Sequence, residues 1–327
     1  MAIDPQVRAH YEAQRAVAAS SGSAPAMSIS GIRRNADAVY NDKDPNPAVW
    51  QVRDVLIPAA FAKGTEAEPV DVPVRIYTPG EAGPYPVLVY YHGGGFMMHN
   101  IQSHDSLCRN LCLACNAVVV NVGYRLAPEA PFPAGFNDCY TAFCWVYEHT
   151  VELNIKPDQM AVSGDSAGAC LSLAVAEKAR DDFRKSGKGP LVSLQLLFYG
   201  TFGALDNDKS PSYQELIRNN YVLTKPFLDL CSKQYEHGLD PKTPYMNPGK
   251  AEDFTDLGRV YLVPAEYDPL RDDSKELARL LKEAGNDVTY EVAPGMMHGF
   301  LLLWKKFDTT RLFIEKAGKF FRETFGN

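Results

Sequence analysis

The sequence predicts an α/β fold in which a mostly parallel sheet is covered by helices on both faces. Short apolar runs typical of buried strands alternate along the chain with segments of helical periodicity. The chain has 327 residues and is 46% hydrophobic, which is enough for one large buried core. Neither an internal repeat nor a low-complexity tract is present in the sequence.

Seven apolar runs are expected to form the strands of this sheet. They are residues 70–77, 86–91, 117–122, 159–163, 192–198, 259–263 and 288–292. Helices are expected between most of them. Phe136, Tyr140, Phe143 and Tyr147 recur at helical spacing, and residues 166–184 are typical of a long helix with an apolar stripe.

Charge and cysteine content limit the kinds of partner. The 33 basic and 40 acidic residues give a net charge of −7, which argues against nucleic acid or an anionic membrane as a partner. Residues 1–20 are polar and lack the apolar core of a signal peptide. The 7 cysteines are an odd number scattered along the chain, which favours the cytoplasm. Cys108, Cys112 and Cys115 follow one helical face, so we expect them to pack in the core rather than to bind a metal. No cofactor is expected.

The most informative motif is Gly164-Asp165-Ser166-Ala167-Gly168, which directly follows the strand-like residues 159–163. A serine between two glycines can occupy a sharp turn from strand to helix, because the glycines remove the Cβ atoms that would collide there. This turn would expose the Ser166 hydroxyl as a nucleophile.

A second motif, His92-Gly93-Gly94-Gly95, follows the strand-like residues 86–91. Three consecutive glycines allow backbone N–H groups to face a cavity, where they can stabilise an oxygen that gains negative charge. His92 is expected to brace this loop through a side-chain hydrogen bond.

A serine nucleophile needs a base to take its proton, and the base needs a carboxylate to orient it. Both are expected after the serine in the sequence, with the carboxylate before the histidine. Of the 7 histidines, His298 is preferred because it lies in a loop-like stretch after residues 288–292. Asp268 follows the strand at 259–263, where sites of parallel sheets collect. Nearby acids leave alternatives for the carboxylate: Glu266, Asp272 and Asp273.

Taken together, the chain resembles the hormone-sensitive-lipase family of α/β-hydrolases, on the branch whose serine motif is G-D-S-A-G. Five blocks appear in family order: residues 92–95, 123–129, 164–168, 268–272 and 298–300. The resemblance implies a triad of Ser166, Asp268 and His298, and an oxyanion hole made by the N–H groups of Gly93, Gly94 and Ala167. It also implies a helical cap formed by residues 1–45 and 203–250, with residues 46–202 and 251–327 as the two parts of the hydrolase core.

The implied function is that of a serine carboxylesterase, which hydrolyses short-chain acyl esters through an acyl-enzyme. Two alternatives remain: a non-catalytic receptor on the same fold, and a dehydratase or lyase that uses the same oxyanion site. Met97 and Met297 flank the two halves of the site, and Tyr221 lies in the expected cap, so all three are candidates for the substrate pocket. The alternative for the methionines is core packing. The apolar residues 300–304, with Phe320 and Phe321, leave a homodimer possible.

Overall fold

A computed structural model of the chain describes residues 2–20, 28–40, 46–63, 68–218 and 222–326. Within these ranges the main sheet has eight strands in the order β1-β2-β4-β3-β5-β6-β7-β9. Their bounds are β1 (Gln51–Ile57), β2 (Val72–Thr78), β3 (Tyr85–Tyr91), β4 (Val118–Val122), β5 (Ile155–Asp165), β6 (Leu194–Phe198), β7 (Arg259–Val263) and β9 (Val288–Tyr290). Neighbours from β4 to β9 pair in parallel, whereas β2 is antiparallel to both β1 and β4. The predicted mostly parallel sheet is confirmed.

Each of the seven predicted strands overlaps an observed one, but β1 was missed. It is an edge strand whose residues are mostly exposed or half-buried, and Arg53 and Asp54 interrupt its apolar pattern. A second small sheet was also missed. It pairs β8 (Ala265–Tyr267) with β10 (Ala293–Met297) in parallel.

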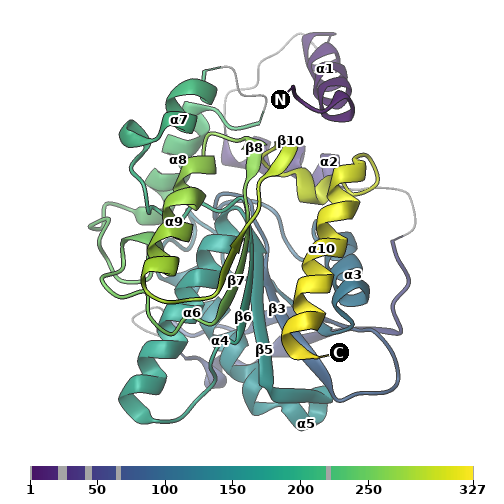
Figure 1. Cartoon of the computed structure of the whole chain (residues 1–327), viewed down its shortest axis with the longest axis vertical. Coiled ribbons are helices and arrows are strands. Elements are labelled where there is room, and N and C mark those ends of the chain that lie inside the picture. The colour runs from purple at the N-terminus through teal and green to yellow at the C-terminus, as the bar shows by residue number, and fades with distance from the viewer. Residues whose placement is uncertain (1, 21–27, 41–45, 64–67, 219–221, 327) are drawn as a thin grey trace.

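Helices cover both faces of the sheet, with a separate apolar core on each side (Figure 1). One face carries α4 (Ala134–Glu148), α6 (Ala167–Ser186) and α9 (Arg271–Glu283), and the other carries α3 (Asp105–Cys115) and α10 (Asp308–Phe325). The short helix α5 (Thr150–Leu153) leads into β5. Along β3, Val87 and Val89 point into the first core, while Leu88 and Tyr90 point into the second, because alternate side chains of a strand face opposite sides.

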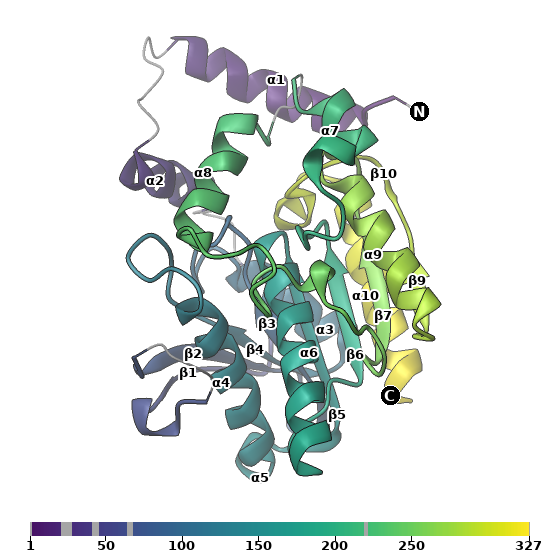
Figure 2. The same cartoon turned by 90° about the vertical axis from the view of Figure 1, so that its left-hand side faces the viewer.

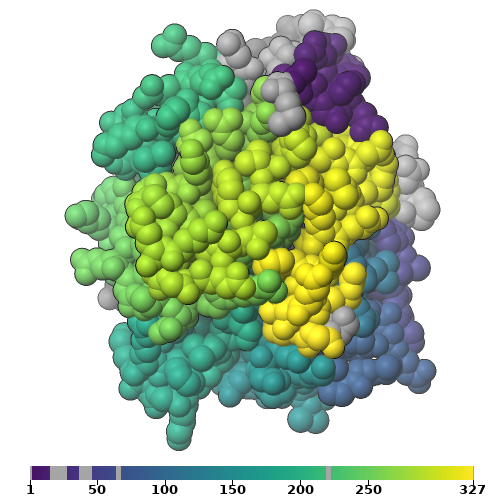
Figure 3. Space-filling model, in the orientation of Figure 1, coloured from purple at the N-terminus to yellow at the C-terminus, as the bar shows by residue number. Residues whose placement is uncertain are grey.

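Four further helices gather beyond the carboxyl ends of the parallel strands (Figure 2). They are α1 (Pro5–Ser20), α2 (Ile29–Tyr40), α7 (Pro211–Leu216) and α8 (Lys225–Glu236). In the space-filling view the C-terminal segments cover much of the visible face, and the N-terminal helix lies at its top (Figure 3). The end of the sheet where sites collect in parallel folds is therefore covered by segments distant in sequence.

Most of the apolar residues that left a dimer possible are buried, and Leu302 and Trp304 are half-buried. Phe300, Leu301, Leu303, Phe320 and Phe321 are buried in the chain's own core. Their apolar character therefore reflects packing of α10 and the preceding turn, and it gives no support to a dimer interface.

Cys108, Cys112 and Cys115 are all buried on α3, as expected for side chains that pack in the core. All seven cysteines of the chain are buried free thiols. Among the helices that the structure describes, none has both the length and the apolar character of a membrane span.

Candidate active site

Ser166 lies at the sharp turn between β5 and α6. Its backbone has a φ of 52° and a ψ of −121°, a strained conformation for a residue with a side chain. A Cβ at Gly168 would collide with the carbonyl oxygen of Tyr91 on the neighbouring strand, and one at Gly164 would lie 2.6 Å from the same oxygen. Both glycines are thus required for the close packing of strand and helix that holds this turn.

The Ser166 hydroxyl is linked to His298 and Asp268 by two hydrogen bonds. His298 Nε2 lies 2.8 Å from Ser166 Oγ, and His298 Nδ1 lies 2.8 Å from Asp268 Oδ2. Asp268 is fully buried, and its other oxygen accepts a hydrogen bond from the Leu270 N–H at 2.9 Å. The structure therefore brings together the three residues that the sequence analysis selected.

The small sheet of β8 and β10 explains why Asp268 and His298 meet. The two strands run in parallel with Met297 opposite Tyr267. Asp268 directly follows β8 and His298 directly follows β10, so both side chains lie at the same end of the small sheet.

The other acids considered for the carboxylate position have different partners. Glu266 accepts a hydrogen bond from the Gly295 N–H at 2.7 Å. Asp272 accepts one from the Ser212 N–H at 2.8 Å, and Asp273 accepts those of Phe202 and Leu205. Asp268 is the one of these four that contacts His298.

The glycine loop after β3 turns sharply, with φ values of 117° at Gly94 and 57° at Gly95. The N–H groups of Gly94, Gly95 and Ala167 have no hydrogen-bond partner among the described residues. Gly94, Gly95 and Ser166 line the same cavity. The Gly94 and Gly95 amides therefore adjoin the cavity, and the unbonded Ala167 amide belongs to the residue directly after the serine, although Ala167 is not part of the cavity lining.

Gly93 differs from the expectation for the oxyanion hole. Its N–H donates to Asp165 Oδ1 at 2.9 Å, and Gly93 is absent from the cavity lining. The amide that the sequence analysis assigned to the oxyanion is therefore already bonded to a buried carboxylate, and the next glycine along the loop has the free amide instead.

Asp165 is a buried acceptor that connects several segments beneath this loop. Its Oδ1 accepts hydrogen bonds from the Tyr90 hydroxyl at 2.7 Å and from the Gly93 N–H, and lies 3.1 Å from His104 Nε2. Burial opposes ionisation of Asp165, but the charge and hydrogen bond of His104 and the bond from Tyr90 hold its pKa well below the usual range. Asp165 is therefore an ionised carboxylate at neutral pH.

His92 braces the loop as expected. Its Nδ1 lies 2.8 Å from the Gly93 carbonyl oxygen, and its ring stacks on Tyr124 with centroids 4.2 Å apart. Burial, and then the charge of His104, lower the pKa of His92 to about 3. The ring is consequently neutral, and its Nδ1–H donates to the carbonyl.

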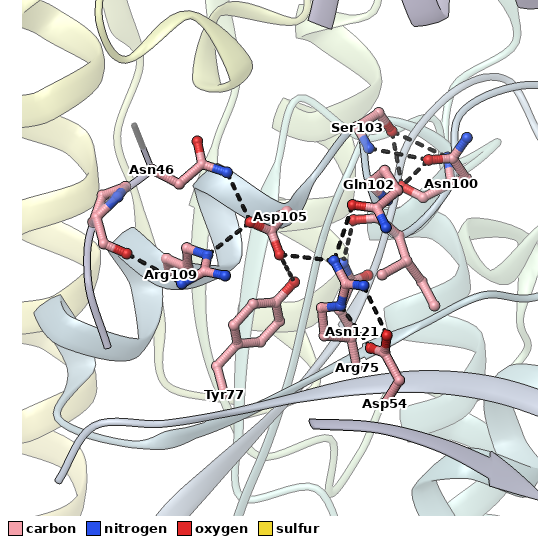
Figure 4. Close-up of polar contacts among 12 residues, drawn as sticks. Asn46, Asp54, Arg75, Tyr77, Asn100, Gln102, Ser103, Asp105, Arg109 and Asn121 are labelled. Carbon is pink, nitrogen blue, oxygen red and sulfur yellow. Dashed lines mark hydrogen bonds and ion pairs between the residues drawn. The ribbon is translucent and has the colours of Figure 1, made fainter. Parts of the chain in front are cut away.

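A polar cluster at the start of α3 fixes the segment that carries His104 (Figure 4). Asp105 is buried and accepts hydrogen bonds from Tyr77 at 2.9 Å, Arg75 at 3.1 Å, Arg109 at 2.7 Å and Asn46 at 2.8 Å. Because His104 directly precedes Asp105, this cluster also fixes the position from which His104 reaches Asp165.

Arg33 on α2 joins the helices above the sheet to the glycine loop. Its Nε donates to the Met97 carbonyl oxygen at 2.7 Å, and one Nη donates to the Ala127 carbonyl oxygen at 3.0 Å. The same guanidinium pairs with both carboxylate oxygens of Glu129. The roles of Arg33, Asp165 and His104 were not predicted from the sequence, because they depend on partners distant in the chain.

A cavity of about 480 Å³ opens above Ser166 and His298. Residues of α1, α2 and α8 line it together with the glycine loop. Met97 and Met297 do not line it: both are buried in packed apolar clusters, so the pocket role expected for them is wrong and the core alternative holds. Met98 lines the cavity instead. Tyr221 lies outside the described residues.

Residues 88–302 match the family described as the alpha/beta hydrolase fold. This stretch spans the glycine loop, the serine turn and both partners of the serine, whereas the cavity-lining residues of α1 and α2 precede it. The chain belongs to the hormone-sensitive-lipase family of α/β-hydrolases.

Several proteins named as esterases or ester hydrolases are similar to this chain over most of its length. Carboxylesterase NlhH of Mycobacterium tuberculosis is 40% identical over 239 residues, which are 71% of this chain and 72% of the relative. Carboxylic ester hydrolase LipN of the same organism is 38% identical over 265 residues, or 80% and 67% of the two chains. The solved hyperthermophilic esterase from Pyrobaculum calidifontis has a TM-score of 0.85 at 30% identity, with both chains covered fully. This α/β-hydrolase is a carboxylic ester hydrolase.

Proposed function

We propose that the protein is a serine carboxylesterase that hydrolyses short-chain acyl esters through an acyl-enzyme, with Ser166, His298 and Asp268 as its catalytic triad. The observation that carries this proposal is the continuous chain of hydrogen bonds from the serine hydroxyl through the imidazole to a buried carboxylate. It is the arrangement that activates a serine for acyl transfer.

In the first step Ser166 Oγ attacks the ester carbonyl carbon while His298 Nε2 takes the hydroxyl proton. Asp268 accepts the Nδ1–H of the ring, which keeps Nε2 free as the base and stabilises the imidazolium once it forms. The imidazolium then donates its proton to the leaving alcohol. A water molecule repeats the attack on the acyl-enzyme, and Ser166 is released with its proton restored.

The negative oxygen formed in each step needs donors fixed before the reaction. The free amides of Gly94, Gly95 and Ala167 support this role, and each is expected to contribute on the order of 10²- to 10³-fold in rate. Gly93 would act indirectly, because its bond to Asp165 holds the loop that carries the other two glycines.

The size of the cavity favours small esters. A volume of about 480 Å³ is in the lower part of the range of about 300–1,000 Å³ typical of small-molecule sites. Residues 1–45 and 203–250 are proposed to form the cap, and residues 46–202 and 251–327 the hydrolase core. The cavity-lining residues of α1, α2 and α8 support that division, because these helices belong to the two proposed cap segments. A cap of this kind would limit the length of the acyl chain.

The alternatives predict different outcomes in one assay. A receptor would bind an ester without hydrolysing it, and a dehydratase or lyase would release an alkene rather than an acid. The contact between Ser166 and His298 favours hydrolysis over both.

A cytoplasmic location is also proposed, supported by seven buried thiols with no disulfide among them.

The test is an acyl-length series of p-nitrophenyl esters, from acetate to dodecanoate, with the wild type and Ser166→Ala. Ser186→Ala is the matched control, since Ser186 lies at the far end of α6 and bonds to the nearby backbone groups of Asp182 and Lys188. We expect the highest kcat/KM for acetate to hexanoate, loss of all catalysis in Ser166→Ala, and an unchanged rate in Ser186→Ala. Retained turnover in Ser166→Ala would refute the triad.

A further inference from the structure

Tyr199 directly follows β6 and packs its ring against the ring of His298. The two ring centroids are 5.0 Å apart, with planes 60° from parallel. The Phe300 ring lies 5.2 Å from Tyr199 and is itself packed against Phe313 of α10 at 6.0 Å. Because Tyr199 is only 1% exposed, the imidazole is in contact with a ring that has little room to move.

The backbone at Tyr199 is tied to the serine turn and to the neighbouring strand β7. The Phe198 carbonyl oxygen accepts a hydrogen bond from the Ser166 N–H at 2.9 Å, and the Tyr199 N–H donates to the Val263 carbonyl oxygen at 2.8 Å. The φ of Tyr199 is 35°, in the left-handed region that bulky residues rarely adopt. Strain of this kind persists only where the surrounding structure enforces it, and it is concentrated at active sites.

The two hydrogen bonds of the imidazole leave it one way to turn. His298 Nδ1 contacts Asp268 and Nε2 contacts Ser166, and the bonding directions of both nitrogens lie in the plane of the ring. The ring can therefore tilt about the line between its two partners without losing either bond. A packed ring beside the imidazole opposes this tilt, because close-packed side chains leave no space for it.

The imidazole loses one of these bonds during the proposed reaction. Once Ser166 is acylated, its Oγ carries no hydrogen and cannot donate to His298 Nε2. Asp268 then remains as the hydrogen-bond partner of the ring. Yet Nε2 must stay aligned to take a proton from the attacking water. The acyl-enzyme is thus the state in which a packing contact with the imidazole matters most.

We propose that Tyr199 is a positioning residue that holds the His298 imidazole in place while Ser166 is acylated, so that its ring accelerates the second step of the reaction more than the first. This role rests on the proposed function, because it concerns the same triad and the same acyl-enzyme. Tyr199 is not among the described residues that line the cavity, so it acts through His298 rather than through the substrate.

Burst kinetics with p-nitrophenyl butyrate separate the two steps, because p-nitrophenol is released in the first step and the free enzyme returns only after the second. Tyr199→Leu removes the ring, and Tyr199→Phe keeps it. Phe321→Leu is the matched control. Phe321 is a fully buried ring of the same apolar core that packs against Phe325 and is absent from the described cavity lining.

We expect Tyr199→Leu to lower kcat by about tenfold or more, since misplacement of a catalytic group by about 1 Å can cost about 10²-fold. The value of kcat/KM, which reports on the first step, should change by less than about threefold. Each folded enzyme should still release about one p-nitrophenol in the burst, whereas a folding defect would lower the burst and kcat together. Tyr199→Phe and Phe321→Leu should retain kcat within about twofold.

The proposal is overturned if kcat of Tyr199→Leu is unchanged or falls together with kcat/KM. It is also overturned if Tyr199→Phe loses as much kcat as Tyr199→Leu, which would assign the effect to the hydroxyl, or if Phe321→Leu does so. Should Tyr199→Leu not fold, Tyr199→Met fills the space without a rigid ring and is judged by the same criteria. Turnover retained in Ser166→Ala would refute the proposed function, whereas an unchanged Tyr199→Leu refutes only this positioning role.

Discussion

The carboxylate of Asp165 accepts a hydrogen bond from the backbone N–H of Gly93 at 2.9 Å, and this contact joins the serine turn to the glycine loop. Asp165 directly precedes Ser166, and Gly93 directly precedes Gly94. The nucleophile and a proposed oxyanion donor are therefore held in register by one buried ionic hydrogen bond, of the kind that is about twice as strong as a neutral one.

Asp165→Asn is predicted to lower kcat by about tenfold or more, because loss of the charge weakens the bond that places Gly94 and Gly95. KM should change much less, since asparagine keeps nearly the same shape at this position of the cavity lining. Steady-state kinetics on p-nitrophenyl butyrate measures both constants. Asp182→Asn is the control, because Asp182 also accepts a tyrosine hydroxyl but lies outside the cavity lining. An equal loss of kcat in both variants would show that Asp165 has no special role.

Arg33→Ala is predicted to lower kcat/KM by about tenfold, because it removes the donors that hold the Met97 and Ala127 carbonyl oxygens and so loosens the glycine loop. Glu129→Gln separates this effect from the ion pair. The Glu129 side chain is 65% exposed, so loss of its charge should leave activity within about twofold. If Glu129→Gln impairs activity as much as Arg33→Ala, the ion pair and not the backbone contacts is responsible.

His99 predicts a pH-dependent part of the stability. Burial, and then the charges of His104 and His92, lower its pKa to about 3 from 6.5. The unfolded state thus binds a proton below pH 6.5 that the folded state accepts only near pH 3. The free energy of unfolding is therefore unaffected by His99 above pH 6.5. Between pH 6.5 and about 3 it falls by about 1.4 kcal/mol for each pH unit, because protonation of His99 favours the unfolded state.

His99→Asn removes that dependence and retains a residue that tolerates the positive φ of 70° at this position. Urea unfolding of both proteins between pH 6.5 and 4.5 gives the free energy of unfolding against pH. We expect the slope for the wild type to be steeper than that for His99→Asn by about 1.4 kcal/mol per pH unit. Parallel slopes would mean that His99 does not remain neutral in the folded protein.

Asp105→Asn is predicted to destabilise the fold by about 2–3 kcal/mol, because Arg75 and Arg109 lose a largely buried charged partner. Asp54→Asn provides the comparison. Asp54 also pairs with Arg75 but is 65% exposed, so its loss should cost less than about 1 kcal/mol. Urea unfolding at pH 7 measures both effects, and similar values for the two variants would contradict the assigned difference in burial.

The sequence predicted those parts of the fold whose signal is local. The seven apolar runs carry their own β pattern, and the parallel order followed from their alternation with helices. The pair of β8 and β10 was missed because each strand is short and β10 contains Pro294 and Gly295. Its pairing depends on contacts between residues about 30 positions apart.

For the site, motif order was sufficient to select Ser166 and His298, whereas the spacing left Asp268 beside Glu266, Asp272 and Asp273 until the family resemblance singled it out. It was not sufficient to choose among the three glycine amides. Which amide is free depends on the Asp165 carboxylate, 72 residues from Gly93. Similarly, the adaptable shape of methionine does not reveal the side of the backbone on which it packs, so Met97 and Met297 were assigned to the cavity instead of the core.

The burial of every native thiol makes this chain a convenient host for chemical labelling. Burial raises the pKa of Cys112, Cys144 and Cys231 to about 12, and raises those of the other four cysteines as well, so few thiolates exist at neutral pH. A single cysteine introduced on the exposed surface would be the dominant site for a maleimide dye. Probes of helix movement above the catalytic serine can therefore be attached without first deleting any natural cysteine.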